Sequence, residues 1–177
     1  MSGQIEIPLS KNKLILMFLG SLIFVALGLW FVIKPPTISN RFLNNPTLIL
    51  TVGIAAILFF GLCTIFLAKK LPDRTPGLII NDLGITDNSS GVSAGLILWS
   101  DIVAITVENV ANQRFIMVIV KNPYDYINRQ TGFIKRKAME INYKSYGSPI
   151  SISANGLKSN FVELYKIILD KYNDSKV

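Results

Sequence analysis

Two long apolar runs decide the fold of this chain: LILMFLGSLIFVALGLWFVI over residues 14–33 and TLILTVGIAAILFFGLCTIFLA over residues 47–68. Neither run contains a charged residue. Lys13 and Lys34 flank the first run, and Lys69 and Lys70 follow the second. At ~1.5 Å of rise per residue, about twenty helical residues span the ~30 Å hydrocarbon core of a bilayer. A buried helix of a soluble protein normally carries a polar stripe, which both runs lack. We therefore predict a transmembrane α-helical hairpin over residues 14–68.

The residues between the two runs favour a hairpin. Pro35 and Pro36 cannot continue the first helix, because proline lacks the backbone N–H and clashes with the preceding turn. Asn45 is a good cap for the second helix, and Pro46 suits its first turn.

Four glycines predict where the two helices pack. In an antiparallel hairpin, Gly20 and Gly61 lie at similar depth near one membrane face, and Gly28 and Gly53 match near the other. Small residues let helix backbones approach closely in lipid. Glycine is also common in membrane helices for other reasons, so the pattern leaves both interpretations open.

The basic residues near the helix ends predict the orientation. Cytoplasmic flanks carry an excess of Lys and Arg. The two outer flanks hold five such residues, and the connecting loop holds two: Lys11, Lys13, Lys69, Lys70 and Arg74 against Lys34 and Arg41. We therefore expect a multi-pass protein with both termini in the cytoplasm. The first run is longer than the apolar part of a signal peptide, and no cleavage site follows it.

Composition excludes several classes of site. The formal charge is +7, of which residues 1–74 contribute +5 and residues 75–177 contribute +2. Most of the basicity therefore flanks the apolar runs, and we expect no nucleic-acid partner. The chain has no histidine, and its single cysteine, Cys63, lies inside the second run. A disulfide within the chain or a Cys/His zinc cluster is thus excluded, and we expect no metal and no cofactor.

The rest of the chain divides into three parts. Residues 1–13 form an N-terminal cytoplasmic segment in which Gln4 to Leu9 alternates polar and apolar side chains, so it is either an edge strand docked on the C-terminal domain or an unstructured tail. Residues 69–76 form a linker with two prolines. Residues 77–177 are long enough for one small soluble domain.

The C-terminal domain is predicted to be β-rich, with a final helix. Strands are expected at residues 78–80, 85–86, 96–99, 102–110, 115–121 and 149–153, with residues 111–114 as a hairpin loop. Residues 124–145 are expected to be mainly helical or irregular. Ser159 is predicted to cap an amphipathic helix. This order favours a bent sheet or open barrel whose open end the C-terminal helix covers.

The run Gly77 to Ile80, then Gly84-Ile85, then Ile97-x-Trp99-x-Asp101-Ile102 resembles the bacterial pleckstrin-homology-like domains. The layout also resembles a family of uncharacterised small bacterial two-helix membrane proteins, in which an Ile-x-Ile-Pro-Leu segment precedes the helices and a Pro-Ile-x-Ile strand precedes the last helix. Residues 5–9 and 149–152 match those motifs. The resemblance implies a bacterial inner-membrane location and the fold, and it transfers no catalytic residue.

One departure bears on ligand recognition. Phosphoinositide-binding relatives of that fold place basic residues in the first hairpin loop, whereas here the loop is Asn81-Asp82-Leu83. The resemblance therefore does not imply recognition of a phosphoinositide headgroup at this loop.

Motifs with catalytic potential are better interpreted as structural. Residues 91–95, GVSAG, match the G-x-S-x-G nucleophile elbow, but the elbow needs a strand before it, a helix after it and a histidine base, so we expect a flexible loop here. Trp99 is expected to pack in the core or at the helix cap, and Asp101 to order a turn. The carboxylates are scattered, without a close pair for acid–base work. We predict no catalytic residue and no enzyme.

A basic segment is the best candidate site. Residues 128–144, NRQTGFIKRKAMEINYK, contain five bases with Phe133, Ile134 and Tyr143 between them. The bases are Arg129, Lys135, Arg136, Lys137 and Lys144. Anionic lipid attracts each base near the inner leaflet by about 1 kcal/mol. A solvated helix face is the plainer interpretation of the same charges.

The sequence therefore predicts a membrane-tethered, non-enzymatic interaction module that binds protein or anionic lipid at the inner membrane surface. The alternative is a structural or assembly subunit, in which the hairpin glycines contact another membrane protein or a second copy of this chain.

Overall fold

The two apolar runs form one compact unit, and the remaining chain forms another. The structure is a computed structural model that describes residues 3–36 and 45–176. Lys11–Asp73 make up the first unit, and Met1–Ser10 together with Arg74–Val177 make up the second. Arg41, which entered the prediction of orientation, lies outside the described residues.

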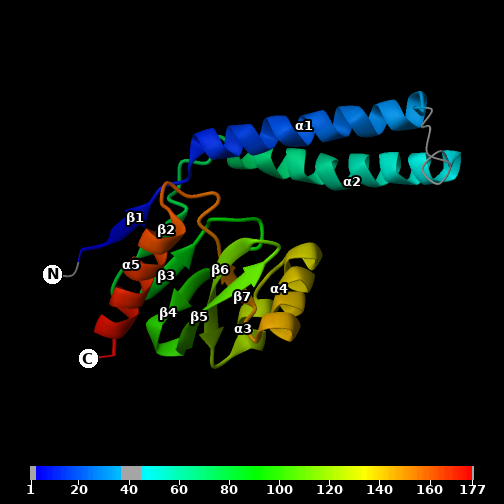
Figure 1. Cartoon of the computed structure of the whole chain (residues 1–177). Helices are drawn as coiled ribbons and strands as arrows, with labels where there is room; N and C mark the ends of the chain where they lie inside the picture. The colour runs from blue at the N-terminus through cyan, green and yellow to red at the C-terminus, as the bar shows by residue number, and fades with distance from the viewer. Residues whose placement is uncertain (1–2, 37–44, 177) are drawn as a thin grey trace. The chain divides into compact units, whose positions relative to one another are not determined.

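The first unit is a helical hairpin. Helix α1 spans Lys11–Ile33 and helix α2 spans Pro46–Lys70, and the two lie side by side (Figure 1). The Asn45 side chain accepts hydrogen bonds from the backbone N–H groups of Thr47 and Leu48, at 3.0 and 3.4 Å, with Pro46 in the first turn. The predicted helices and the cap are confirmed, and both helices extend slightly beyond the apolar runs.

Both helices are long and apolar enough to cross a membrane. In the most apolar 18-residue stretch of each helix, only 11% of the residues are buried inside the protein. The core helix of a soluble protein is mostly covered, whereas these helices present large apolar side chains outward almost all round. This weakly indicates a membrane protein.

A packed seam of apolar and small residues holds the hairpin together. The buried residues of α1 are Leu14, Ser21 and Gly28, which are seven residues apart, the spacing of helices packed like a left-handed coiled coil. The Ser21 and Thr64 hydroxyls lie 2.8 Å apart across the seam. Each is also 2.8 Å from a carbonyl one turn earlier in its own helix, so neither oxygen lacks a hydrogen-bond partner.

Polar groups close the hairpin next to the linker. The Lys11 ammonium donates to the backbone carbonyls of Leu71, at 2.7 Å, and Asp73. Lys70 forms an ion pair with the Asp73 carboxylate at 2.9 Å. The carbonyls at the C-terminal end of α2 lack partners within the helix and carry its negative dipole end, so a lysine from the start of α1 stabilises them.

The second unit contains two antiparallel sheets, in the orders β1-β2-β3-β4 and β5-β6-β7. The strands of the first sheet are β1 Ile5–Ile7, β2 Leu78–Ile80, β3 Gly84–Asp87 and β4 Gly95–Leu98. Those of the second sheet are β5 Ile102–Val110, β6 Gln113–Val120 and β7 Ile150–Ile152. A short 3₁₀ turn, Trp99–Asp101, joins β4 to β5.

The N-terminal segment belongs to this domain. Strand β1 pairs antiparallel with β2, Ile5 opposite Ile80 and Ile7 opposite Leu78. Leu9 forms a bridge with Leu157, and the backbone N–H of Ser10 donates to the Gly156 carbonyl at 2.8 Å. Of the two interpretations of residues 4–9, the edge strand is confirmed.

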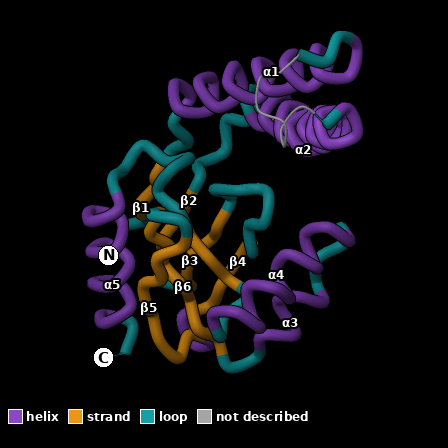
Figure 2. Tube along the Cα trace, turned by 45° about the vertical axis from the view of Figure 1, so that its right-hand side comes forward, coloured by secondary structure: helices purple, strands orange, loops and turns teal. Residues whose placement is uncertain are grey.

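Within the described residues of this unit, three helices pack around the strands. They are α3, Pro123–Asn128, α4, Phe133–Tyr146, and α5, Phe161–Asp174. Figures 1 and 2 show α5 on one side of the strands and α3 and α4 on the other. The predicted helical character of residues 124–145 is confirmed as two helices, and Gly147 ends the second one with a left-handed φ of 72°.

Two local predictions needed correction. The cap of α5 is Asn160, whose side chain accepts from the Glu163 N–H at 3.0 Å, and not Ser159, whose hydroxyl lies 3.1 Å from the Glu163 carboxylate. The loop between β5 and β6 contains only Ala111 and Asn112, since both have left-handed φ, 49° and 62°, as a two-residue hairpin turn requires.

The core lies between the strands and α5. Fully buried apolar side chains come from β2, β3, β4, β6 and β7 and from the helix, and they include Leu78, Ile85, Ile97, Ile116, Val118, Ile152, Leu164 and Ile168. Ser148 is buried with them, and its hydroxyl donates to the Val118 carbonyl at 2.5 Å and accepts from the Ile150 N–H at 3.0 Å. The expected antiparallel sheets and C-terminal helix are therefore present.

Candidate functional site

Helix α4 carries an unusual exposed face. Its first two residues, Phe133 and Ile134, are 82% and 72% exposed, and Ile141 is 54% exposed. Ile134 and Ile141 are two turns apart and therefore lie on the same side of the helix. The opposite side anchors the helix, because Met139 is fully buried. Large apolar side chains thus point outward from a helix that is already packed on its other side.

Three of the five predicted bases are exposed on α4: Arg136, Lys137 and Lys144. Arg136 is two residues from Ile134, so it projects from the other side of the helix, beside Glu140. Lys137 and Lys144 alternate with Ile134 and Ile141 at helical spacing, so bases and apolar groups form one stripe. We call Phe133, Ile134, Arg136, Lys137, Ile141 and Lys144 the α4 face. Glu140 is the acidic residue beside it, and Phe133, Arg136, Lys137 and Glu140 line a shallow depression of about 270 Å³.

The ion pairs of the α4 face hold its charges loosely. Arg136 Nε lies 3.9 Å from Glu140 Oε1, and Lys137 Nζ lies 3.2 Å from Glu140 Oε2, with the Arg136 and Lys137 side chains about half exposed. Arg136 Nη2 also donates to the Asn128 side-chain oxygen at 2.8 Å. Exposed pairs of this kind contribute about 0–1 kcal/mol. Arg136 and Lys137 can therefore leave Glu140 and bind another anion at a small cost in free energy.

Arg129 is placed differently from these three bases. Its Nη2 donates to the carbonyls of Ala94 and Leu96, at 2.7 and 2.5 Å, and its guanidinium lies 4.1 Å from the centre of the Tyr126 ring. The guanidinium therefore attaches α3 to the outer edge of β4. The structure assigns Arg129 to the framework of the domain rather than to the α4 face.

Lys135 also points away from the α4 face. It is half-buried, and its positive charge acts on the carboxylate of Asp87, which is only 3% exposed. That carboxylate accepts hydrogen bonds from the Ser89 N–H, the Ser89 hydroxyl and the Ala94 N–H, at 2.9, 2.7 and 3.2 Å. Burial raises the pKa of Asp87, and these bonds and Lys135 oppose the increase.

The segment that matches G-x-S-x-G forms part of the loop that Asp87 orders. Ser93 is buried, and its hydroxyl donates to the Ser90 carbonyl, at 2.5 Å, and accepts from the Ser90 N–H, at 2.9 Å. Strand β4 follows it at Gly95. Ser93 therefore closes a hydrogen-bonded turn in a segment that we expected to be a flexible loop.

Trp99 and Asp101 hold the corner between the sheets. The Trp99 indole N–H donates to the Asn81 carbonyl at 2.8 Å. Asp101 accepts from the Tyr126 hydroxyl at 2.8 Å and forms an ion pair with Lys121 at 3.4 Å. Burial and the bond to Asp101 raise the pKa of Tyr126 to about 12. Trp99 is buried, as the sequence predicts, whereas the Asp101 carboxylate bonds to side chains outside its own turn.

An open groove beside this corner was not anticipated. It has a volume of about 530 Å³, and Leu83, Leu98, Trp99, Tyr172 and Lys176 are among the residues that line it. The Tyr172 hydroxyl donates to the Val103 carbonyl at 2.7 Å. The polar atoms of Trp99 and Tyr172 already have backbone partners, and the groove is also lined by Asp82, Ser100, Ser175 and Lys176.

The hairpin glycines separate into two pairs. A Cβ on Gly28 would lie 2.9 Å from the Gly53 carbonyl oxygen, and one on Gly53 would lie 3.0 Å from the Gly28 oxygen, so the backbones touch there. A Cβ on Gly20 or Gly61 would meet nothing within 4 Å. The expected contact between Gly20 and Gly61 is absent, because Ser21 and Thr64 form the seam near that depth.

Sequence patterns alone did not predict this seam or the partners of Arg129. The seven-residue spacing of Leu14, Ser21 and Gly28 was a usable signal, whereas the link between Arg129 and β4 joins residues more than thirty positions apart.

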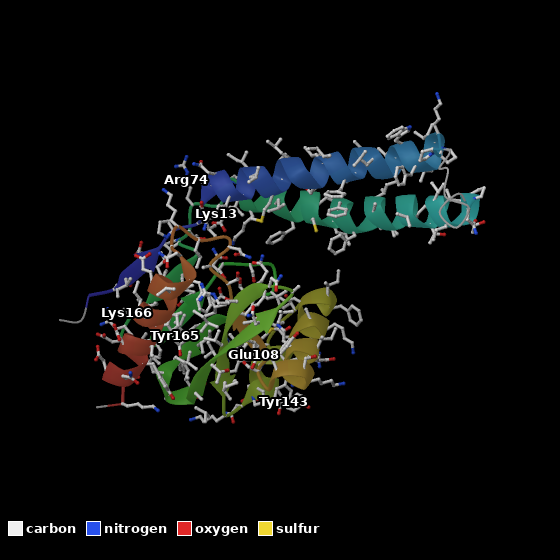
Figure 3. The ribbon with its side chains drawn as sticks, viewed as in Figure 1. Lys13, Arg74, Glu108, Tyr143, Tyr165 and Lys166 are labelled. Carbon is white, nitrogen blue, oxygen red and sulfur yellow. The ribbon has the colours of Figure 1, made fainter. Side chains whose placement is uncertain are left out.

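Tyr143, labelled in Figure 3, packs edge-on against the ring of Tyr124, with the ring centres 5.5 Å apart.

Among the residues that the structure describes, no three His, Cys, Asp or Glu side chains form a group that could hold a metal ion. Comparison with known proteins gives no family: no family model, no curated protein and no solved structure matches the chain.

Proposed function

We propose that this chain is a membrane-tethered, non-enzymatic interaction module whose α4 face binds anionic lipid headgroups. The supporting observation is the outward stripe of α4, where Phe133 and Ile134 are 82% and 72% exposed beside Lys137. Apolar groups that enter the headgroup boundary, interleaved with bases that attract anionic lipid, are typical of helices that lie on a membrane surface.

In this proposal, α1 and α2 cross the cytoplasmic membrane of a bacterium, and both termini face the cytoplasm. The support is the apolar outer surface of both helices and the excess of basic residues on the outer flanks. The domain is of the pleckstrin-homology-like class, on the resemblance of residues 77–102 and the order of strands and helix. Tethering keeps a weak surface site near the bilayer at high effective concentration.

The charge of the α4 face sets the expected strength of binding. Its three bases and the neighbouring Glu140 give a net charge of +2. At about 1 kcal/mol per charge near an anionic surface, this contributes ~2 kcal/mol, or about 30-fold in the ratio of docked to undocked domain. The contribution falls as salt shortens the Debye length from about 10 Å at 0.1 M to about 3 Å at 1 M.

The full chain in lipid nanodiscs tests the proposal. With Cys63 replaced by alanine, an environment-sensitive fluorophore on Ile141→Cys reports contact of α4 with the bilayer. We expect a blue shift in anionic discs that is absent in neutral discs and is lost at high salt. Replacing Arg136, Lys137 and Lys144 by glutamate should abolish the shift.

A matched control carries the same change of charge elsewhere. Replacing the exposed Lys158, Lys166 and Lys176 by glutamate leaves the α4 face intact, and Figure 3 labels Lys166 on α5. The control variant should keep the blue shift. If the two triple variants behave alike, or if the shift is equal in neutral discs, the α4 face does not recognise anionic lipid.

A further inference from the structure

The four edge strands of the domain differ in how they are protected. Unpaired backbone groups on an edge strand are a template for pairing with another strand, and proteins normally cover or shorten such edges. Among the described residues the edge strands are β1, β4, β5 and β7. Strands β1 and β7 contain three residues each, and Pro8 follows β1.

The other two edge strands show opposite solutions. Arg129 covers β4 by donating to the outward carbonyls of Ala94 and Leu96. Strand β5 is nine residues long, and its start is covered by the Tyr172 hydroxyl, which donates to the Val103 carbonyl. From Ile105 to Asn109, within the described ranges, no group bonds to the outer side of β5.

The hairpin turn determines which residues face this open edge. Ala111 and Asn112 form a two-residue turn, so the closing pair, Val110 and Gln113, exchanges hydrogen bonds between β5 and β6. Inward and outward backbone groups alternate along the strand from that pair. The N–H and C=O groups of Ile105, Val107 and Asn109 therefore point away from β6.

The sequence of β5 offers little protection. The strand reads IVAITVENV, without proline or lysine, and its single charge is Glu108, labelled in Figure 3. Val103 is 57% exposed and Val107 is 40% exposed. A long edge with these features is expected to pair with another strand.

We propose that β5 pairs antiparallel, edge to edge, with β5 of a second copy of this chain, on a two-fold axis through Val107. The open segment is symmetric about that residue, since the outward positions are Ile105, Val107 and Asn109. Val107 then faces its own copy, and Ile105 faces Asn109 of the other chain. Each of these pairs exchanges two backbone hydrogen bonds.

The proposed pairing of the two β5 strands also places no like charges opposite each other. Glu108 faces Thr106 of the other copy, so no like charges stand directly opposite each other. The Tyr172 contact at Val103 and the turn at Ala111 limit the pairing to the open segment. The two three-stranded sheets would join as β7-β6-β5-β5-β6-β7, and this inference is independent of lipid binding by α4.

Cysteine cross-linking of the purified full chain tests the register. In a Cys63→Ala background, Val107→Cys places two thiols on a hydrogen-bonded pair with Cα atoms about 5.5 Å apart, within the range of a disulfide. Two copies of Ile105→Cys would lie about 14 Å apart, because they are offset by four residues. We expect oxidation to cross-link two copies of the Val107→Cys variant at least about tenfold faster than two copies of the Ile105→Cys variant. Equal rates would mean random collision and would overturn the proposal.

The dimer dissociation constant tests the same pairing without a cross-link. Val107→Lys places like charges opposite each other on the axis, so the dimer dissociation constant of the detergent-solubilised chain should rise at least about tenfold. Leu96→Lys is the matched control, since Leu96 is also 40% exposed but lies on the covered β4 edge. It should leave the dimer intact. A wild-type chain that stays monomeric overturns self-pairing and leaves the edge to a strand of another protein.

Discussion

Adding one methyl group at Gly28 should loosen the helical hairpin. The new Cβ would lie 2.9 Å from the Gly53 carbonyl oxygen, 3.0 Å from Ile57 Cγ1 and 3.2 Å from Ala56 Cβ. One of these neighbours is backbone, so Gly28→Ala forces the helices apart and removes dispersion contacts along the seam. Overpacking of this kind costs about 1–3 kcal/mol.

Alkylation of a buried thiol measures the opening of the seam. Ser21 is 5% exposed, so Ser21→Cys in a Cys63→Ala background gives a single thiol that reacts when the helices separate. When opening and closing are fast, the rate follows the open population. A cost of about 1–3 kcal/mol then raises the rate of alkylation about 5- to 140-fold in detergent micelles.

Gly20→Ala is the matched control for this experiment. It makes the same change in the same helix with a similar gain in helix propensity, but its Cβ meets nothing within 4 Å. Its rate should stay within about twofold of the parent. If Gly28→Ala reacts no faster than Gly20→Ala, the close approach of Gly28 and Gly53 does not hold the hairpin together.

Two further predictions concern the buried carboxylate and the alternative function. Because burial raises the pKa of Asp87 above its usual 3.8, its protonated form favours the folded state, and its contribution to stability falls as pH rises from 3.8 through the raised pKa. Chemical denaturation across this range should show that fall relative to Asp87→Asn, and parallel curves would contradict it. If the hairpin is instead an assembly subunit, Gly20→Leu and Gly61→Leu, at positions open to the outside, should abolish co-purification of a membrane-protein partner. Unchanged co-purification would exclude those glycines as the interface.

Local sequence signals determined the elements of this protein. The uncharged runs and the Asn45-Pro46 start specified both helices, because helix length and capping depend on neighbouring residues. Alternating apolar residues likewise located β7. The N-terminal strand was left undecided, since its existence depends on pairing with β2, about seventy residues away.

Only the tertiary structure decided which candidate residues are available for binding. The sequence grouped Arg129 with Arg136 and Lys137 because they are close along the chain. Folding brings Arg129 to the carbonyls of Ala94 and Leu96, whereas Arg136 and Lys137 stay exposed on α4. The sequence also did not predict the open edge of β5. An edge stays open only when no other strand of the fold pairs with it, and the sequence of the strand itself does not show this. Composition and spacing fix where helices and strands form, but hydrogen bonds between distant residues determine which charges and edges remain exposed.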